Sequence, residues 1–200
     1  MKKIETIWEC LLEEAINQHR YPHTQKEMAQ RFGFSLSTIH HALKIPVQMG
    51  AVRKESRFFI LEDFQKLLYY WASVRNFAND IIYQTTIDQP VFEIEGLALP
   101  ASTFACFSAA RRHLGEPPSD YSKVYWYVLP QALDSCKERF PFQPDKRKDF
   151  NVTLLRMPSF MKQQNITTLT HTFVDIWNLR DWYAKEFTRA LEEKINGLLS

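Results

Sequence analysis

Two short amphipathic segments joined by a glycine, between Thr24 and Val52, constrain the fold of this chain most. Thr24 is a residue type that caps helices, and Glu27 three positions later completes a reciprocal capping box. The first helix then carries an apolar face at helical spacing, formed by Met28, Ala29 and Phe32. We expect this helix to end at Gly33, because a tight turn favours a residue without a Cβ atom.

A second helix is predicted after this turn. Ser35 provides its cap, and its apolar row is Leu36, Ile39, Leu43 and Val47. The opposite face exposes short or polar side chains able to contact phosphates or base edges, namely Ser37, Thr38, His40, His41 and Lys44. Pro46 lies inside this helix, so we expect a kink in its final turn. The pattern favours a helix-turn-helix with a DNA-recognition helix, although any short helical hairpin produces the same turn and apolar rows.

Two short strand-like runs follow, at 51–54 and 57–61, separated by Glu55-Ser56. That spacing is typical of a hairpin. Arg53, Lys54 and Arg57 lie at or beside its tip, where cations can contact the DNA backbone. From Thr24 to Arg57 there are six cations and two carboxylates, whereas the whole chain has a net charge of only +2. Positive charge is therefore concentrated here, as phosphate binding requires, and a merely solvated surface is the other interpretation.

The order of helix, helix, turn, helix and two-stranded wing resembles the winged-helix family of transcriptional regulators over residues 1–62. The run from Ile4 to Gln18 supplies the leading helix, with its apolar stripe at Ile7, Trp8, Leu11, Leu12, Ala15 and Ile16. The resemblance implies a domain that binds double-stranded DNA. The candidate DNA-binding residues are Lys26, Ser35, Ser37, Thr38, His40, His41, Lys44, Arg53, Lys54 and Arg57.

A connecting helix over residues 63–78 is predicted next, with Asp63 as its cap and a continuous apolar face. That face either closes the first core or pairs with a second copy of the chain.

No apolar run approaches the roughly 20 residues that span a bilayer, and acidic residues follow the N-terminal lysines, so we expect a cytoplasmic protein. Cys10, Cys106 and Cys136 are predicted to be buried thiols with neither a disulfide nor a zinc site.

Residues 79–200 alternate short strands with helices, which predicts an α+β domain around a small mixed sheet. The expected strands are 81–86, 91–94, 122–129 and 152–157. The expected helices are 100–114, 130–139 and a long C-terminal helix at 180–199 that Asn178 caps. Lys146, Arg147 and Lys148 form a basic run that we interpret as a solvated loop face, and only secondarily as a phosphate contact.

This second domain resembles the C-terminal domain of AbiEi-like type IV antitoxins. The similar segments are GLALPASTFACFSAARRHLG, DYSKVYWYV and TLTHTFVDIWNL. The positions that carry the resemblance are Gly96, Leu99, Ala101, Ala109, Tyr125, Val128 and Asp175. It implies a winged helix coupled to a domain related in fold to nucleotidyltransferases, and it makes a cognate toxin a possible partner.

Catalysis is not predicted for this domain. A nucleotidyltransferase needs a glycine-serine turn and paired carboxylates that hold magnesium, and the chain has no Gly-Ser pair. Asp120 has no partner carboxylate in the sequence pattern, and an exposed strand face explains Glu93 and Glu95. The histidines lack paired metal-ligand spacing, and adjacent His40 and His41 point about 100° apart on a helix. We therefore expect no catalytic residues, no bound metal and no cofactor.

The sequence thus predicts an α+β protein with an N-terminal winged helix-turn-helix and a long C-terminal helix. Its predicted function is that of a sequence-specific, DNA-binding transcriptional regulator, acting as a homodimeric repressor or an antitoxin-type autoregulator, with no membrane partner. Two alternatives stay open at this point. One is a nucleotidyltransferase-type enzyme that acts on nucleotides or RNA, and the other is a winged-helix module that binds a protein in place of DNA.

Overall fold

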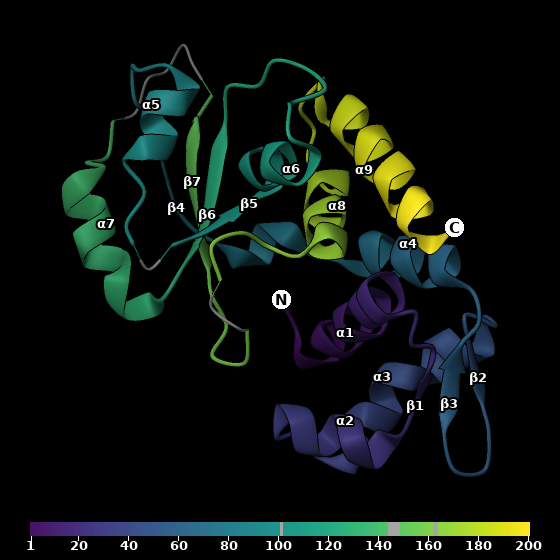
Figure 1. Ribbon diagram of the computed structural model, residues 1–200. Helices are drawn as coiled ribbons and strands as arrows, with labels where there is room; N and C mark the ends of the chain where they lie inside the picture. Colours follow the sequence, from purple (N-terminus) through teal and green to yellow (C-terminus); the bar gives the residue numbers. More distant parts are fainter. Residues whose placement is uncertain (101, 144–148, 162–163) are drawn as a thin grey trace. The chain divides into compact units, whose positions relative to one another are not determined.

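A computed structural model describes residues 1–100, 102–143, 149–161 and 164–200 of the chain (Figure 1). It confirms the predicted α+β class, the mixed sheet and the C-terminal helix. The chain divides into two compact units, one formed by Met1–Arg75 with Glu193–Ser200 and the other by Asn76–Glu192. Within the described ranges, no helix is both long and apolar enough to cross a bilayer. The basic run at Lys146, Arg147 and Lys148 lies outside the described residues, as does Ala101.

The first unit combines four helices with a small antiparallel sheet of strand order β1-β3-β2. Its elements are α1 (Lys3–Gln18), β1 (Pro22–His23), α2 (Gln25–Phe32), α3 (Leu36–Gln48), β2 (Val52–Lys54), β3 (Phe59–Leu61) and α4 (Phe64–Val74). The apolar stripe of α1 is fully buried at Ile7, Leu11, Leu12 and Ala15. It packs against α3 and α4, so the connecting helix closes the core of this unit.

Helix caps and turns in this unit form as the side-chain chemistry predicts. Thr24 and Ser35 accept hydrogen bonds from the backbone N–H groups three residues later, at 3.1 and 3.2 Å. Asp63 caps α4 in the same way at 2.9 Å. Gly33 ends α2 with φ +64°, in the left-handed region that favours glycine. The Glu27 carboxylate, expected to complete the capping box, is hydrogen-bonded to Arg20.

Pro46 lies inside α3 and is buried. A proline has no N–H group, so it leaves the carbonyl oxygen of Ala42, four residues earlier, without its usual helical donor. The indole of Trp8 on α1 supplies the missing donor, because its Nε1 lies 2.7 Å from the Ala42 oxygen. Trp8 and Ala42 are both buried, so water cannot replace this hydrogen bond. The link from α1 to α3 therefore compensates for the proline.

Replacing Trp8 with Phe should lower the free energy of unfolding by about 1–3 kcal/mol, because a buried carbonyl loses its partner. In a Pro46→Ala background the same replacement should cost less, since residue 46 then has an N–H group able to bond Ala42. Urea unfolding of the parent, both single variants and the double variant measures this coupling. An equal cost of Trp8→Phe in both backgrounds would contradict the proposed compensation.

The second unit contains a four-stranded sheet of order β4-β7-β6-β5. Strands β6 and β7 are parallel and the other pairs are antiparallel. The strands are β4 (Ile81–Thr85), β5 (Thr103–Ala105), β6 (Val124–Val128) and β7 (Val152–Arg156). The helices are η1 (Phe77–Asp80), α5 (Val91–Gly96), α6 (Cys106–Leu114), η2 (Pro130–Ala132), α7 (Leu133–Arg139), α8 (Leu169–Trp177) and α9 (Ala184–Leu199). The last residues of α9 group with the first unit, where Gln65 donates a hydrogen bond to Asn196 at 3.1 Å.

Strand β6, one of the two inner strands, is buried on both faces. Helices lie on both sides of the sheet (Figure 1). Val124, Trp126 and Val128 join the apolar cluster that contains Ile94 of α5 and Cys136 of α7. Tyr125 and Tyr127 face the other way, toward α6 and α8, where the Tyr127 hydroxyl bonds Asp175. The strand itself was predicted, whereas its burial on both faces is a finding of the structure.

Four expectations about this unit are corrected. The run 91–94, expected as a strand, is the start of α5, because Pro90 precedes it and Ile94 is buried at helical spacing from Val91. The helix expected from residue 100 begins only at Cys106, since Thr103–Ala105 pairs with β6. Helix α8 was not predicted, and Asn178 terminates it by donating to the Val174 carbonyl. Consequently α9 begins at Ala184, four residues after its expected start.

The first unit departs from the expectations at its sheet. Strand β1 was not predicted, because Pro22–His23 is too short to show a period-two pattern. The run expected to begin a strand at Arg57 begins one at Phe59, and residues 55–58 form the turn, closed by Glu55 N–H to the Phe58 carbonyl at 2.8 Å. All three cysteines are free and buried, as predicted.

Candidate nucleic-acid interface

Helix α3 has one buried and one exposed face. Ile39, Ala42, Leu43 and Pro46 are buried. The exposed residues include the candidates Ser35, Ser37, His40, His41 and Lys44, and Thr38 is half-buried. The hydroxyl oxygens of Ser35 and Thr38 lie 2.9 Å apart, so the residue that caps the helix also orients Thr38. The polar side chains predicted on this face therefore lie together and reach solvent.

For two exposed residues of α3, the prediction from the sequence was wrong or incomplete. Leu36 was expected in the buried row, yet it is 55% exposed. Gln48 is exposed and lies two turns beyond His41 on the polar face. Its amide can form the paired hydrogen bonds that recognise adenine. The helical period alone places it there, so the sequence did contain this signal.

The hairpin of β2 and β3 presents its cations unequally. Lys54 and Arg57 are exposed, at the end of β2 and in the turn. Arg53 is also exposed, but its guanidinium pairs with Glu55 and with Glu62, the second at 2.5 Å from its Nε. Glu62 lies outside the stretch from Thr24 to Arg57, so the charge balance of that stretch did not include its carboxylate. Two carboxylates therefore offset the charge of Arg53.

The positive charge available at this surface comes from four other residues. Lys26, Lys44, Lys54 and Arg57 are exposed, and none of them forms an ion pair with any residue that the structure describes. Arg31, counted with them in the sequence, pairs with Glu14 and stacks over Phe32. These cations lie on α2, on the β2–β3 hairpin and on α3, the helix that carries the polar face.

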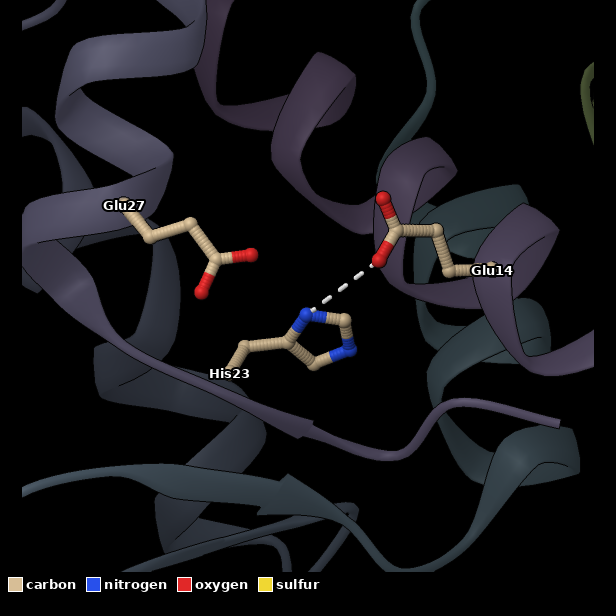
Figure 2. Close-up of side chains that lie close together, drawn as sticks. All are labelled: Glu14, His23 and Glu27. Carbon is tan, nitrogen blue, oxygen red and sulfur yellow. Dashed lines mark ion pairs between the residues drawn. The ribbon is translucent and has the colours of Figure 1, made fainter. Parts of the chain in front are cut away.

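A cluster of charged side chains ties α1, β1 and α2 together beside this surface (Figure 2). The Glu14 carboxylate accepts from Arg20 at 3.0 Å and from Arg31, and Arg20 also pairs with Glu27. His23 is fully buried, with its Nδ1 3.5 Å from Glu14. Figure 2 shows its ring between the carboxylates of Glu14 and Glu27.

The ligand atoms of Glu14, His23 and Glu27 lie within 4.8 Å of one another, a spacing that suits a metal ion. The charge of the cluster does not suit one. Two guanidiniums already balance the two carboxylates, so a divalent cation would enter beside Arg20 and Arg31. We interpret the cluster as an ion-pair brace. Burial, reinforced by the positive charge of Arg20, holds the pKa of His23 below its usual 6.5.

This lowered pKa makes the first unit less stable in acid. Above about pH 6.5 His23 is neutral in both the folded and the unfolded chain, and its contribution does not vary. As the pH falls below that value the unfolded chain takes up the proton first, so stability declines until the folded pKa is reached. Replacing His23 with Gln should reduce the loss of unfolding free energy between about pH 7 and pH 5. Exposed His40→Gln is the control and should keep the parental profile, and a parental profile for His23→Gln would contradict the assignment.

The carboxylates considered for catalysis in the second unit do not form a pair. Glu93 is exposed, whereas Glu95 is buried, because α5 is helical and the two residues no longer share a face. Glu95 accepts from the Tyr121 hydroxyl and from Arg111, both at 2.6 Å. Burial and the hydrogen bond to Glu95 raise the pKa of Tyr121. Asp120 is exposed on the loop before β6.

Comparisons of the chain with protein-family models, with curated proteins and with solved structures found no match. The resemblances to winged-helix regulators and to AbiEi-like antitoxins therefore stay predictions.

Proposed function

We propose that the first unit is a winged-helix domain and that the protein is a sequence-specific transcriptional regulator that binds double-stranded DNA. Two observations carry this proposal: α3 has a polar, solvent-facing side, and exposed cations without an ion-pair partner among the described residues lie on α2, on α3 and on the β2–β3 hairpin. An α-helix fits the major groove of B-DNA, and the flanking cations then meet phosphates.

The residues divide by the part of the duplex that they contact. Lys26, Lys54 and Arg57 neutralise phosphates, which positions the protein without reading the sequence. Ser37, His41 and Lys44 on α3 approach base edges or the adjacent backbone. Arg53 keeps the hairpin in shape through Glu55 and Glu62, and contributes less to phosphate binding than Lys54 and Arg57.

The regulator acts as a homodimer in this proposal, as a repressor or an antitoxin-type autoregulator. Two copies related by a twofold axis read the two halves of a palindromic site. The second unit, whose sheet is covered by helices on both faces, is then available for a protein partner such as a cognate toxin. An unchanged monomer at the concentrations that saturate DNA would refute the dimer.

Removing the two unpaired hairpin cations, in Lys54→Ala/Arg57→Ala, should weaken binding to every sequence. Each lost phosphate contact lowers the slope of log K against log salt by about 0.9, so the double variant should lose up to about 1.8. Arg53→Ala is the matched control in the same hairpin and should change the slope less, because Glu55 and Glu62 already offset its charge. Titrations over a range of salt concentrations measure these slopes. Parental affinity of the double variant at every salt concentration would refute the hairpin contact.

Replacing His41 with Ala should change which sequences are bound, because a base-edge contact discriminates by about 1–3 kcal/mol. Selection from random duplexes with the parent and the variant reveals the altered position. Lys26→Ala serves as the control, because a lost phosphate contact weakens all sites alike and leaves the selected sequence unchanged. Identical selected sequences for the parent and His41→Ala would remove His41 from the base-reading face.

A further inference from the structure

Leu36 is an exposed apolar residue at the start of α3. It is the first residue of the helix, directly after the cap Ser35, and it is 55% exposed. Ile39 and Leu43 of the same helix are buried at 0% and 3%. Leu36 therefore contributes little to the core, and its apolar surface is in contact with water in the free protein.

The helical period places Leu36 at the border of the polar face. At about 100° per residue, it lies roughly 40° from His40 and roughly 100° from Ser37, both exposed. Ile45, 41% exposed, lies about 180° away and borders the polar face on its other side. Leu36 is thus an apolar group beside hydrogen-bonding residues in the first turn of the helix.

The first turn of a recognition helix is the part that reaches base edges in the major groove. Most groups displayed there are hydrogen-bond donors or acceptors, which a leucine side chain cannot bond. The 5-methyl group of thymine is the apolar exception, and apolar side chains recognise thymine through it. Burying a methyl-sized group between the two surfaces is favourable by about 0.8 kcal/mol.

We propose that Leu36 packs against the 5-methyl group of a thymine, so that the DNA sites of this protein require a thymine under the first turn of α3. This inference rests on the proposed DNA-binding function and adds the base that one residue selects. Ser37 and His40 beside Leu36 then bond polar groups of the same or the neighbouring base pair.

The test removes the methyl group from the DNA and the side chain from the protein separately. A duplex selected by the full-length chain is prepared with each thymine replaced in turn by deoxyuridine, which pairs identically and lacks the methyl group. For the parent protein, one such replacement in each half-site should raise the Kd about fourfold, the change that corresponds to roughly 0.8 kcal/mol. For Leu36→Ala the same replacement should leave the Kd unchanged, because the apolar partner is already absent.

Ile45→Ala is the matched control, since it truncates an exposed apolar residue on the other border of the same helix. It should keep the parental response to deoxyuridine at every position. Loss of the response in Ile45→Ala as well, or an unchanged response in Leu36→Ala, would overturn the role of Leu36 while leaving DNA binding in place. Failure of the parent chain to select any duplex would instead overturn the proposed function, and this inference with it.

Discussion

The hydrogen bond from Trp8 to the Ala42 carbonyl is the interaction on which the first unit depends. It joins the buried stripe of α1 to the interior of α3 at the point where Pro46 interrupts helical hydrogen bonding. A helix that presents side chains to a partner must hold its orientation against its own core. Here that orientation comes from a directional contact between buried groups as well as from apolar packing.

The ion-pair brace adds a second set of contacts within the first unit. Arg20 pairs with Glu14 on α1 and with Glu27 on α2, and Arg31 of α2 pairs with Glu14, so these arginines fix α2 relative to α1. His23 on β1 lies beside Glu14. The cations of the ion-pair brace and those of the candidate interface differ in whether carboxylates pair with them. Carboxylates offset Arg20, Arg31 and Arg53, whereas Lys26, Lys44, Lys54 and Arg57 are exposed and form no ion pair with a described residue. A count of charges along the sequence cannot make this distinction, because it does not show which carboxylate pairs with which cation.

Local chemistry predicted much of the structure from the sequence. The caps at Thr24, Ser35 and Asp63 and the glycine turn depend on neighbouring residues only, so they could be recognised directly. Strand β6 was recognisable from its β-branched and aromatic residues, which favour strands.

Elements that depend on distant partners were harder to predict. The run 91–94 has both strand and helix periodicity, and burial of Ile94 against the sheet decides for the helix. Strand β1 exists because it pairs with β3. In the candidate interface the polar face of α3 was predicted correctly as a face, but the ion pairs of Arg53 and the exposure of Leu36 required the structure.

The number of unpaired cations bears on the oligomeric state of a DNA-binding form. Four phosphate contacts per unit give a salt slope of roughly −3.6, so raising salt fourfold would weaken binding by a factor on the order of 10². Doubling the contacts to eight squares that factor to about 10⁴, within the range of specific DNA-binding proteins. Under the proposed function, four cations per copy would therefore match the salt response of a specific DNA-binding protein only when two copies bind one palindromic site.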